Sequence, residues 1–111
     1  MARSRFEPRQ FARPPESFGR TANPDWHPSA GTDHDEVETF QVAAVIQHQA
    51  CFVLRGRLKE LGMSVPEFAR QSGVHADRLR RILRGEIVMQ LADLARLNVV
   101  GLSVGFRVPP K

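Results

Sequence analysis

Tyrosine is absent from this sequence of 111 residues, and cysteine occurs only once. The single cysteine, Cys51, excludes an internal disulfide and suits a reducing compartment. Long apolar runs are also missing, because Arg55 and Arg57 interrupt the best candidate, and we predict no membrane-spanning helix. The first residues, MARSRFEPRQF, have no apolar stretch after their arginines, which argues against a secretory signal. These absences predict a cytoplasmic protein that has no membrane partner.

The sequence also lacks a catalytic or metal-binding constellation. No nucleophile has a suitable base, and no glycine-rich phosphate loop follows a strand. Cys51 has one histidine nearby, His48, and we interpret that pair as coincidental. Residues 33–38 place His34 beside carboxylates, but contiguous side chains are not spaced for one helical face. We therefore expect no enzymatic activity, no cofactor and no metal, and we expect His48 and His27 to be exposed.

Positive charge is concentrated in one part of the chain. The net charge is only +4, yet residues 52–84 hold eight Lys or Arg and three acids, a difference of +5. Residues 33–51 hold four acids and no Lys or Arg, which gives −4. Such a concentration is expected of a surface that binds nucleic acid, because phosphates attract it. The alternative is an arginine-rich helix face that only meets solvent.

Residues 64–85, SVPEFARQSGVHADRLRRILRG, carry the clearest local signal. Ser64 and Glu67 have the spacing of a capping box, in which each side chain bonds the other residue's backbone N–H. Pro66 falls in the first turn, where its missing N–H costs nothing. Gly73 suits the positive φ angle that ends a helix. The pattern predicts a short helix that begins after Ser64 and ends at Gly73.

A second helix is predicted from about His75 to Arg84. Leu79, Ile82 and Leu83 form its apolar stripe, and four arginines occupy much of the remaining surface. Gly85 is suited to end it. The two helices and their tight turn have the shape of a helix-turn-helix.

Helices are also predicted on both sides of this pair. The upstream helix covers about Val37–Leu61, and its core-facing stripe is Leu54, Leu58 and Leu61. Over Thr39–Ile46 a strand is the open alternative, since so short an apolar run is ambiguous.

The downstream helix covers Gln90–Asn98, and its core-facing leucines are Leu91, Leu94 and Leu97. Beyond it, Val99–Val108 alternates apolar residues with glycine, serine and arginine, which makes it a candidate for a short strand.

The domain organisation follows from these elements. Residues 1–34 are rich in proline and poor in aliphatic residues, and we predict a disordered or weakly ordered arm. Residues 35–98 form the helix-turn-helix domain, and residues 99–111 form a C-terminal tail. The expected fold class is all-α, a small helical bundle with a disordered N-terminal arm and, as an alternative left open, a short C-terminal strand.

The helix pair resembles the lambda-repressor-like, Cro-type (XRE) helix-turn-helix family, over roughly residues 42–98. The chain departs from that family at Leu58 and Leu83, where many members hold a buried arginine–glutamate pair, and at Val65, where many carry glutamine. The matched positions share one spacing and are Ser64, Glu67, Phe68, Ala69, Gly73, Val74, Leu79, Ile82 and Gly85.

The resemblance implies a sequence-specific DNA-binding transcriptional regulator, similar to a repressor of bacterial or phage origin and associated with the nucleoid. Its first implied partner is double-stranded DNA. The second is another copy of the chain, because one such domain contacts only a few base pairs and specific binding usually needs two. The implied base contacts lie on the second helix and are Ala76, Asp77, Arg78 and Arg81. The implied phosphate contacts are Ser64, His75, Arg80 and Arg84.

Two other functions stay open from the sequence. In one, the chain is an interaction module, such as an antitoxin or adaptor, whose residues 1–34 bind a protein partner through phenylalanine and tryptophan. In the other, it is a non-specific DNA-packaging protein.

Overall fold

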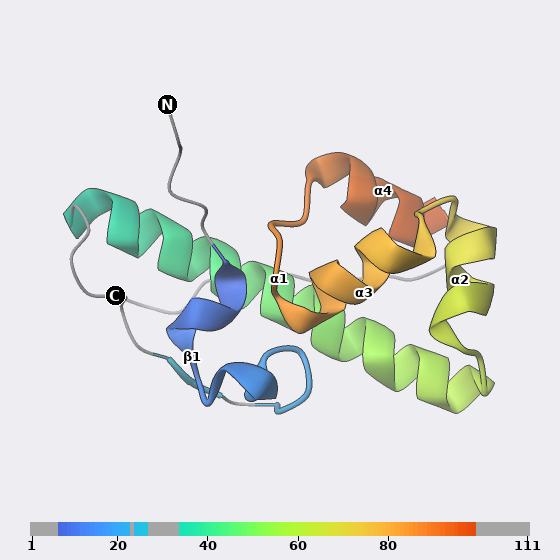
Figure 1. The fold of residues 1–111 in the computed structure, drawn as a ribbon, viewed down its shortest axis with the longest axis horizontal. Helices are drawn as coiled ribbons and strands as arrows, with labels where there is room; N and C mark the ends of the chain where they lie inside the picture. Colours follow the sequence, from blue (N-terminus) through green and yellow to red (C-terminus); the bar gives the residue numbers. More distant parts are fainter. Residues whose placement is uncertain (1–6, 23, 27–33, 100–111) are drawn as a thin grey trace.

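The computed structural model describes residues 7–22, 24–26 and 34–99 (Figure 1). This part is mostly helical but also contains a small two-stranded sheet, so the all-α expectation needs that correction. The predicted strand over Val99–Val108 lies outside the described residues, except that Val99 ends a helix. In chain order the elements are the 3-10 helices and strands η1 (Pro8–Phe11), β1 (Ala12–Arg13), η2 (Pro15–Ser17) and β2 (Asp25–Trp26), then α1 (His34–Leu61), α2 (Val65–Ser72), α3 (Ala76–Arg84) and α4 (Leu91–Val99).

The long helix α1 is the element against which the rest packs (Figure 1). It confirms the predicted upstream helix, and the strand alternative over Thr39–Ile46 is wrong. Leu54 and Leu58 are buried as expected, but Leu61 is 52% exposed. The reason is that α1 ends at Leu61, and the chain turns away there through Gly62, whose φ is 62°. Among the described residues, no helix has both the length and the apolar character needed to span a bilayer.

Helix α2 has the predicted start and end. The Ser64 hydroxyl accepts from the Glu67 N–H at 3.3 Å, and the Glu67 carboxylate accepts from the Ser64 N–H at 3.0 Å, which confirms the capping box. Gly73 ends the helix with a φ of 79° and donates to the Ala69 carbonyl at 3.0 Å. Val74 is buried just after this turn and packs in the same apolar cluster as Phe68 and Leu79.

The core lies where α2, α3 and α4 meet the C-terminal half of α1. From α3 it receives the predicted stripe of Leu79, Ile82 and Leu83, each at most 2% exposed. These side chains pack with Leu54 of α1 and Phe68 of α2 in one apolar cluster. Each fully buried leucine or isoleucine contributes about 1.5–3 kcal/mol to folding, so this stripe fixes which face of α3 remains outside.

The N-terminal segment, residues 7–22 and 24–26, is packed rather than disordered, which corrects the prediction for residues 1–34. Phe11 and Phe18 are 2% and 1% exposed, and their burial offsets the entropy lost on ordering the segment. Residues Ala12 and Trp26 pair across the antiparallel strands β1 and β2. Residues 1–6, 23 and 27–33 of the predicted arm, with His27, lie outside the described residues, and His34 begins α1.

His48 was expected to be exposed, and it is buried at 3% exposure under this segment. Its Nδ1 accepts from the Gly19 N–H at 2.8 Å. Its ring makes edge contacts with Phe18 and Trp26 and stacks on Phe52. The partners of His48 therefore come mostly from the segment that the sequence failed to place.

Helix α4 is present as predicted, but its buried face is turned from the one expected. Leu97 is buried and Leu94 is half-buried, whereas Leu91 is 84% exposed. Asp93 takes the inward position in the first turn and is 4% exposed. Asp93 can face inward in place of Leu91 because a charged residue of α3 pairs with it.

Candidate nucleic-acid interface

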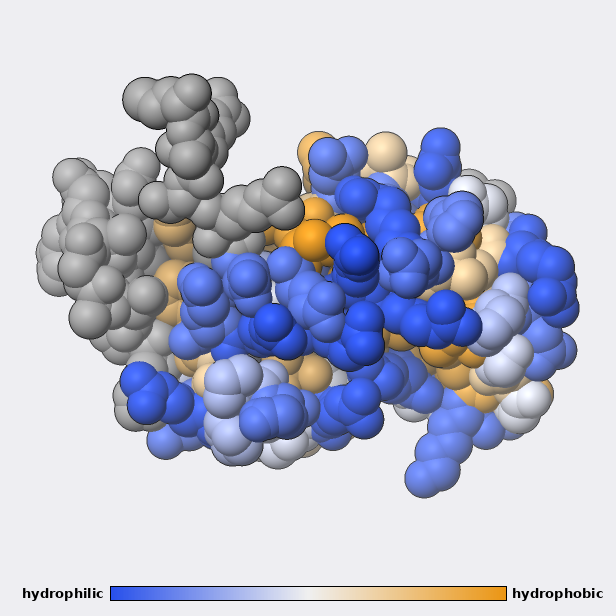
Figure 2. All heavy atoms as spheres, in the orientation of Figure 1, coloured by the Kyte–Doolittle hydropathy of each residue, from blue (hydrophilic) through white to orange (hydrophobic). Residues whose placement is uncertain are grey.

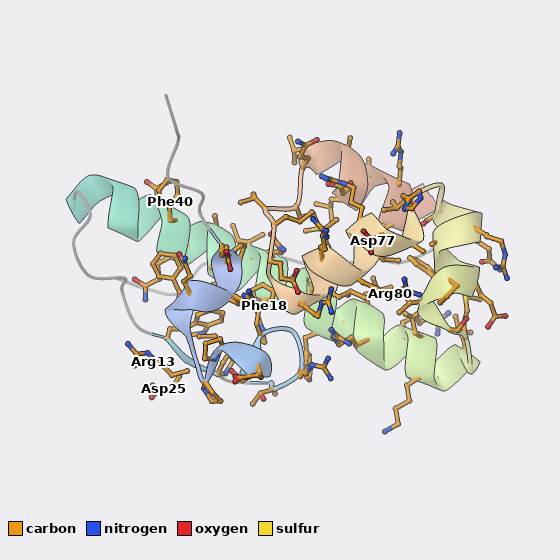
Figure 3. The ribbon with its side chains drawn as sticks, in the orientation of Figure 1. Arg13, Phe18, Asp25, Phe40, Asp77 and Arg80 are labelled. Carbon is orange, nitrogen blue, oxygen red and sulfur yellow. The ribbon has the colours of Figure 1, made fainter. Side chains whose placement is uncertain are left out.

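The outer face of α3 is exposed along its length. Asp77 and Arg81 keep 64% and 53% of their side-chain surface, Arg84 keeps 48%, and Arg80 is also exposed. Figure 3 places Asp77 and Arg80 on this helix. Figure 2 shows hydrophilic side chains running across the middle of the face that contains α3 and the N-terminal segment. The helix thus divides into a buried apolar stripe and an exposed charged surface.

The N-terminal turn of α3 is held by His75. The His75 Nδ1 accepts from the Asp77 N–H at 3.3 Å, so this predicted phosphate contact caps the helix. Ala76 follows and is half-buried. Ser64 plays the same capping part at α2, and both residues remain exposed. A capped helix start presents its remaining N–H groups to an anion, which suits a phosphate.

Asp77 and Arg81 lie one turn apart on the exposed face, and the Asp77 Oδ2 is 3.7 Å from the Arg81 Nε. An exposed pair of this kind contributes about 0–1 kcal/mol. That energy is small compared with a bidentate contact between arginine and a guanine, which discriminates by about 1–3 kcal/mol. So weak a pair leaves the Arg81 side chain able to turn to another partner.

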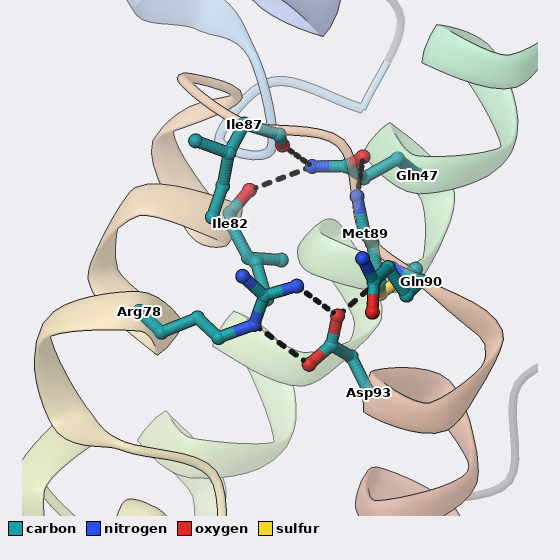
Figure 4. Close-up of polar contacts among 7 residues, drawn as sticks. All are labelled: Gln47, Arg78, Ile82, Ile87, Met89, Gln90 and Asp93. Carbon is teal, nitrogen blue, oxygen red and sulfur yellow. Dashed lines mark hydrogen bonds and ion pairs between the residues drawn. The ribbon is translucent and has the colours of Figure 1, made fainter.

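Arg78 is not free, in contrast to its predicted place among the base contacts. Its Nε and Nη2 donate to both carboxylate oxygens of Asp93, at 3.0 and 2.7 Å (Figure 4). Asp93 also accepts from the Gln90 N–H at 2.8 Å, so the carboxylate caps α4 as well. The guanidinium holds the pKa of Asp93 below its usual range, and the same bond raises the pKa of Arg78. Arg78 joins α3 to α4.

One signal in the sequence could have revealed the partner of Arg78. Asp93 precedes Leu97 by four residues, which puts both on one face of a helix. An acid at that position of an apolar face needs a cation from a neighbouring element.

The C-terminal turn of α3 is bonded to α1 by Gln47, which sequence analysis did not single out. Its amide nitrogen donates to the carbonyls of Ile82 and Ile87, both at 3.0 Å (Figure 4). Its amide oxygen accepts from the Met89 N–H at 2.7 Å. One buried side chain therefore fixes the end of α3 and the loop that follows it. The sequence did contain a signal for this role, because Gln47 is a polar residue at helical spacing from Leu54, on the same apolar stripe.

Two more side chains of α1 bond the same end of α3. The Cys51 thiol donates to the Ile82 carbonyl at 3.4 Å, and Arg55 Nη2 donates to the Leu83 carbonyl at 3.2 Å. Burial raises the pKa of the Cys51 thiol to about 12, so the group stays protonated at neutral pH. These donors bond carbonyls in the last turn of α3, where the helix itself supplies few partners.

Within the part of the chain that the structure describes, no three His, Cys, Asp or Glu side chains gather as metal ligands. The side chains of the acidic segment 33–38 lie outside that part. The chain matches no protein-family model, and it has no significant similarity to a curated protein or to a solved structure.

Proposed function

We propose that this protein is a sequence-specific DNA-binding regulator of the repressor type, in which α2 and α3 act as a helix-turn-helix and α3 enters the major groove. The observation that carries the proposal is the division of α3 into a buried apolar stripe and an exposed charged face. An α-helix is about 10–12 Å across with its side chains, and the major groove is about 12 Å wide.

Base recognition is assigned to the first turns of α3. The guanidinium of Arg81 bonds both acceptors of a guanine, since its fork matches their spacing. Asp77 accepts from a cytosine amine, and Ala76 touches a thymine methyl. Arg78 is removed from this set, because its Nε and Nη2 are bonded to Asp93 and hold the guanidinium against α4.

Phosphate recognition is assigned to residues around this helix. Arg80 and Arg84 are exposed cations of α3, and they bind the backbone on either side of the groove. Ser64 and His75 lie at the starts of α2 and α3, where free N–H groups favour an anion.

Side-chain bonds hold α3 in place at two points, and the resulting rigidity of this helix supports the assignment. The Arg78–Asp93 pair fixes α3 against α4, and Gln47 fixes its C-terminal end against α1. A recognition helix held in place loses less entropy on binding, so its contacts give more affinity and sharper selectivity.

The interaction-module alternative loses part of its basis. Phe11 and Phe18 were candidate anchors for a protein partner, and both are buried within this chain. Trp26 is half-buried and packs against Phe18.

Selection of bound fragments from random duplex DNA at near-physiological salt tests the proposal. The expected result is enrichment of one short motif by the parent protein, and its loss in an Arg80→Ala/Arg81→Ala variant. An Arg57→Ala/Lys59→Ala variant is the control, since it removes equal charge from exposed positions of α1. Recovery of unselected sequence by the parent would contradict sequence-specific binding and favour the packaging function.

A further inference from the structure

The N-terminal segment reaches the C-terminal end of α3 and packs closely there. The Arg9 N–H donates to the Gly85 carbonyl at 3.1 Å. A Cβ placed on Gly19 would lie 2.9 Å from the Leu83 carbonyl oxygen, and one on Gly85 would lie 2.7 Å from the Phe18 ring. Both glycines also have a positive φ, of 72°. The backbone at Gly19 is therefore held close beside the end of α3.

This packing gathers three arginines, which we call the arginine cluster: Arg20, Arg55 and Arg84. They come from the N-terminal segment, from α1 and from α3. Burial lowers the pKa of Arg55, and the positive charges of Arg20 and then Arg84 lower it further. The Arg55 Nε is buried, and no partner for it lies among the described residues. The cluster thus brings three positive charges close enough to affect one another.

The acids near the cluster are shared among several cations. Glu86 lies 2.8 Å from the Arg84 Nε and 3.8 Å from the Arg9 Nη1. Within the described part of the chain, no acid lies within ion-pair distance of Arg20, which is exposed. Arg20 is thus the guanidinium best placed to take an external anion.

A hollow of 620 Å³ opens beside the cluster. Its lining carries three guanidinium groups and one carboxylate. The lining residues are Arg9, Pro15, Glu16, Phe18, Arg20 and Arg84. A guanidinium presents its donors in a plane that matches two oxygens of a phosphate. The guanidinium groups of the lining suit a phosphodiester.

We propose that Arg20 and Arg84, with Arg55 behind them, bind a backbone phosphate of duplex DNA that flanks the groove entered by α3. This inference rests on the proposed function and adds the N-terminal segment to its interface. Arg84 belongs both to α3 and to the hollow, so the cluster continues the charged face of the helix. Figure 2 shows the hydrophilic surface running from α3 onto this segment.

The test compares Arg20→Ala with Arg13→Ala on a long duplex and on a duplex cut back to the motif selected by the parent. Arg13 is the matched control, because it is an exposed arginine of the same segment, in β1 (Figure 3). On the long duplex, Arg20→Ala should reduce the slope of log K against log salt by about 0.9, the value for one phosphate, while base preference stays unchanged. Arg13→Ala should keep the parent slope. On the short duplex, Arg20→Ala should match the parent.

The outcomes separate this inference from the proposed function. If the parent binds its motif and Arg20→Ala keeps the parent slope on the long duplex, the phosphate site is overturned and the regulator function stands. If Arg20→Ala lost the same amount of slope on both duplexes, the phosphate that Arg20 binds would not lie outside the groove entered by α3. If the parent enriches no motif, the proposed function fails by itself. Thermal unfolding of Arg20→Ala checks that the N-terminal segment stays folded. Arg20→Lys keeps the positive charge and should therefore restore part of the slope of log K against log salt.

Discussion

Arg81 is the residue on which base selection depends in the proposed complex. Its side chain is 53% exposed, and its Nε lies 3.7 Å from the carboxylate of Asp77, one turn earlier. Replacing Arg81 with alanine should cost about 1–3 kcal/mol on the selected site and relax the preference at one base pair. Fluorescence titration on the selected and on random duplexes measures both effects. Arg84→Ala is the control and should weaken both duplexes alike. Equal loss on the two duplexes for Arg81→Ala would refute its role in base recognition.

His48 makes the stability of the fold depend on pH. Burial lowers its pKa below the usual value of about 6.5, and its Nδ1 accepts from Gly19, which requires that nitrogen to be unprotonated. The unfolded chain therefore binds the proton more readily than the folded chain. The contribution of His48 is complete above about pH 6.5 and is lost as the pH falls from there through the folded pKa.

Urea denaturation at pH 7.5 and 5.5 should show a lower free energy of unfolding at the acid value. In His48→Gln, which cannot titrate, that difference should shrink. An undiminished difference in this variant would assign the pH dependence to another group.

At the scale of elements, the bond between α3 and α4 is the contact most sensitive to a single change. Arg78→Ala would leave the carboxylate of Asp93 buried at 4% exposure without its cation. Loss of a fully buried pair costs about 3–5 kcal/mol, and the partial exposure of Arg78 reduces the expected loss to about 1–3 kcal/mol. Chemical denaturation measures it, and Arg80→Ala, at an exposed neighbour, should change stability by less than about 0.5 kcal/mol. Equal effects of the two variants would show that the pair does not hold α4.

The N-terminal segment gives a second prediction at this scale. Phe18 is 1% exposed and contacts Gly85 and His48, so Phe18→Ala should cost about 3–5 kcal/mol in denaturation experiments. Phe52→Ala is the control, because Phe52 is 39% exposed and should cost clearly less. A loss below 1 kcal/mol for Phe18→Ala would mean that the segment does not pack on the domain in solution.

At the scale of the whole molecule, a single recognition helix contacts too few base pairs for specific binding, so we predict a homodimer on DNA. The exposed apolar residues Phe52 and Val53 of α1 are one place where a second copy could pack. The selected motif should be an inverted repeat whose half-sites are about 10 base pairs apart. Sedimentation of the complex should give two chains per duplex. One chain on a single half-site, at the same affinity, would contradict the dimer.

Local signals were sufficient where the contacts are local. Ser64, Glu67 and Gly73 define α2 through bonds that span three or four residues, and the sequence places all of them correctly. The stripe of α3 was predictable for the same reason, because helical spacing alone puts its apolar residues on one face. The base-reading and phosphate-binding roles stay predictions that the titrations above must test.

Long-range contacts account for the errors. The proline content of residues 1–34 indicates disorder, yet Phe18 packs against Gly85, and Gly19 bonds His48 twenty-nine residues away. Arg78 and Asp93 likewise lie fifteen residues apart, on different helices. A pattern within a few residues can mark Asp93 as an acid on an apolar face, but it does not show which distant residue pairs with it.

The sequence by itself determined where α2 and α3 begin and end and which face of α3 is apolar, because capping bonds and helical periodicity act within a few residues. Only the tertiary structure decided which charges remain available to a ligand. In the folded chain Arg78 pairs with Asp93, and Arg20 lies beside Arg84. The availability of a side chain depends on which distant elements pack around it.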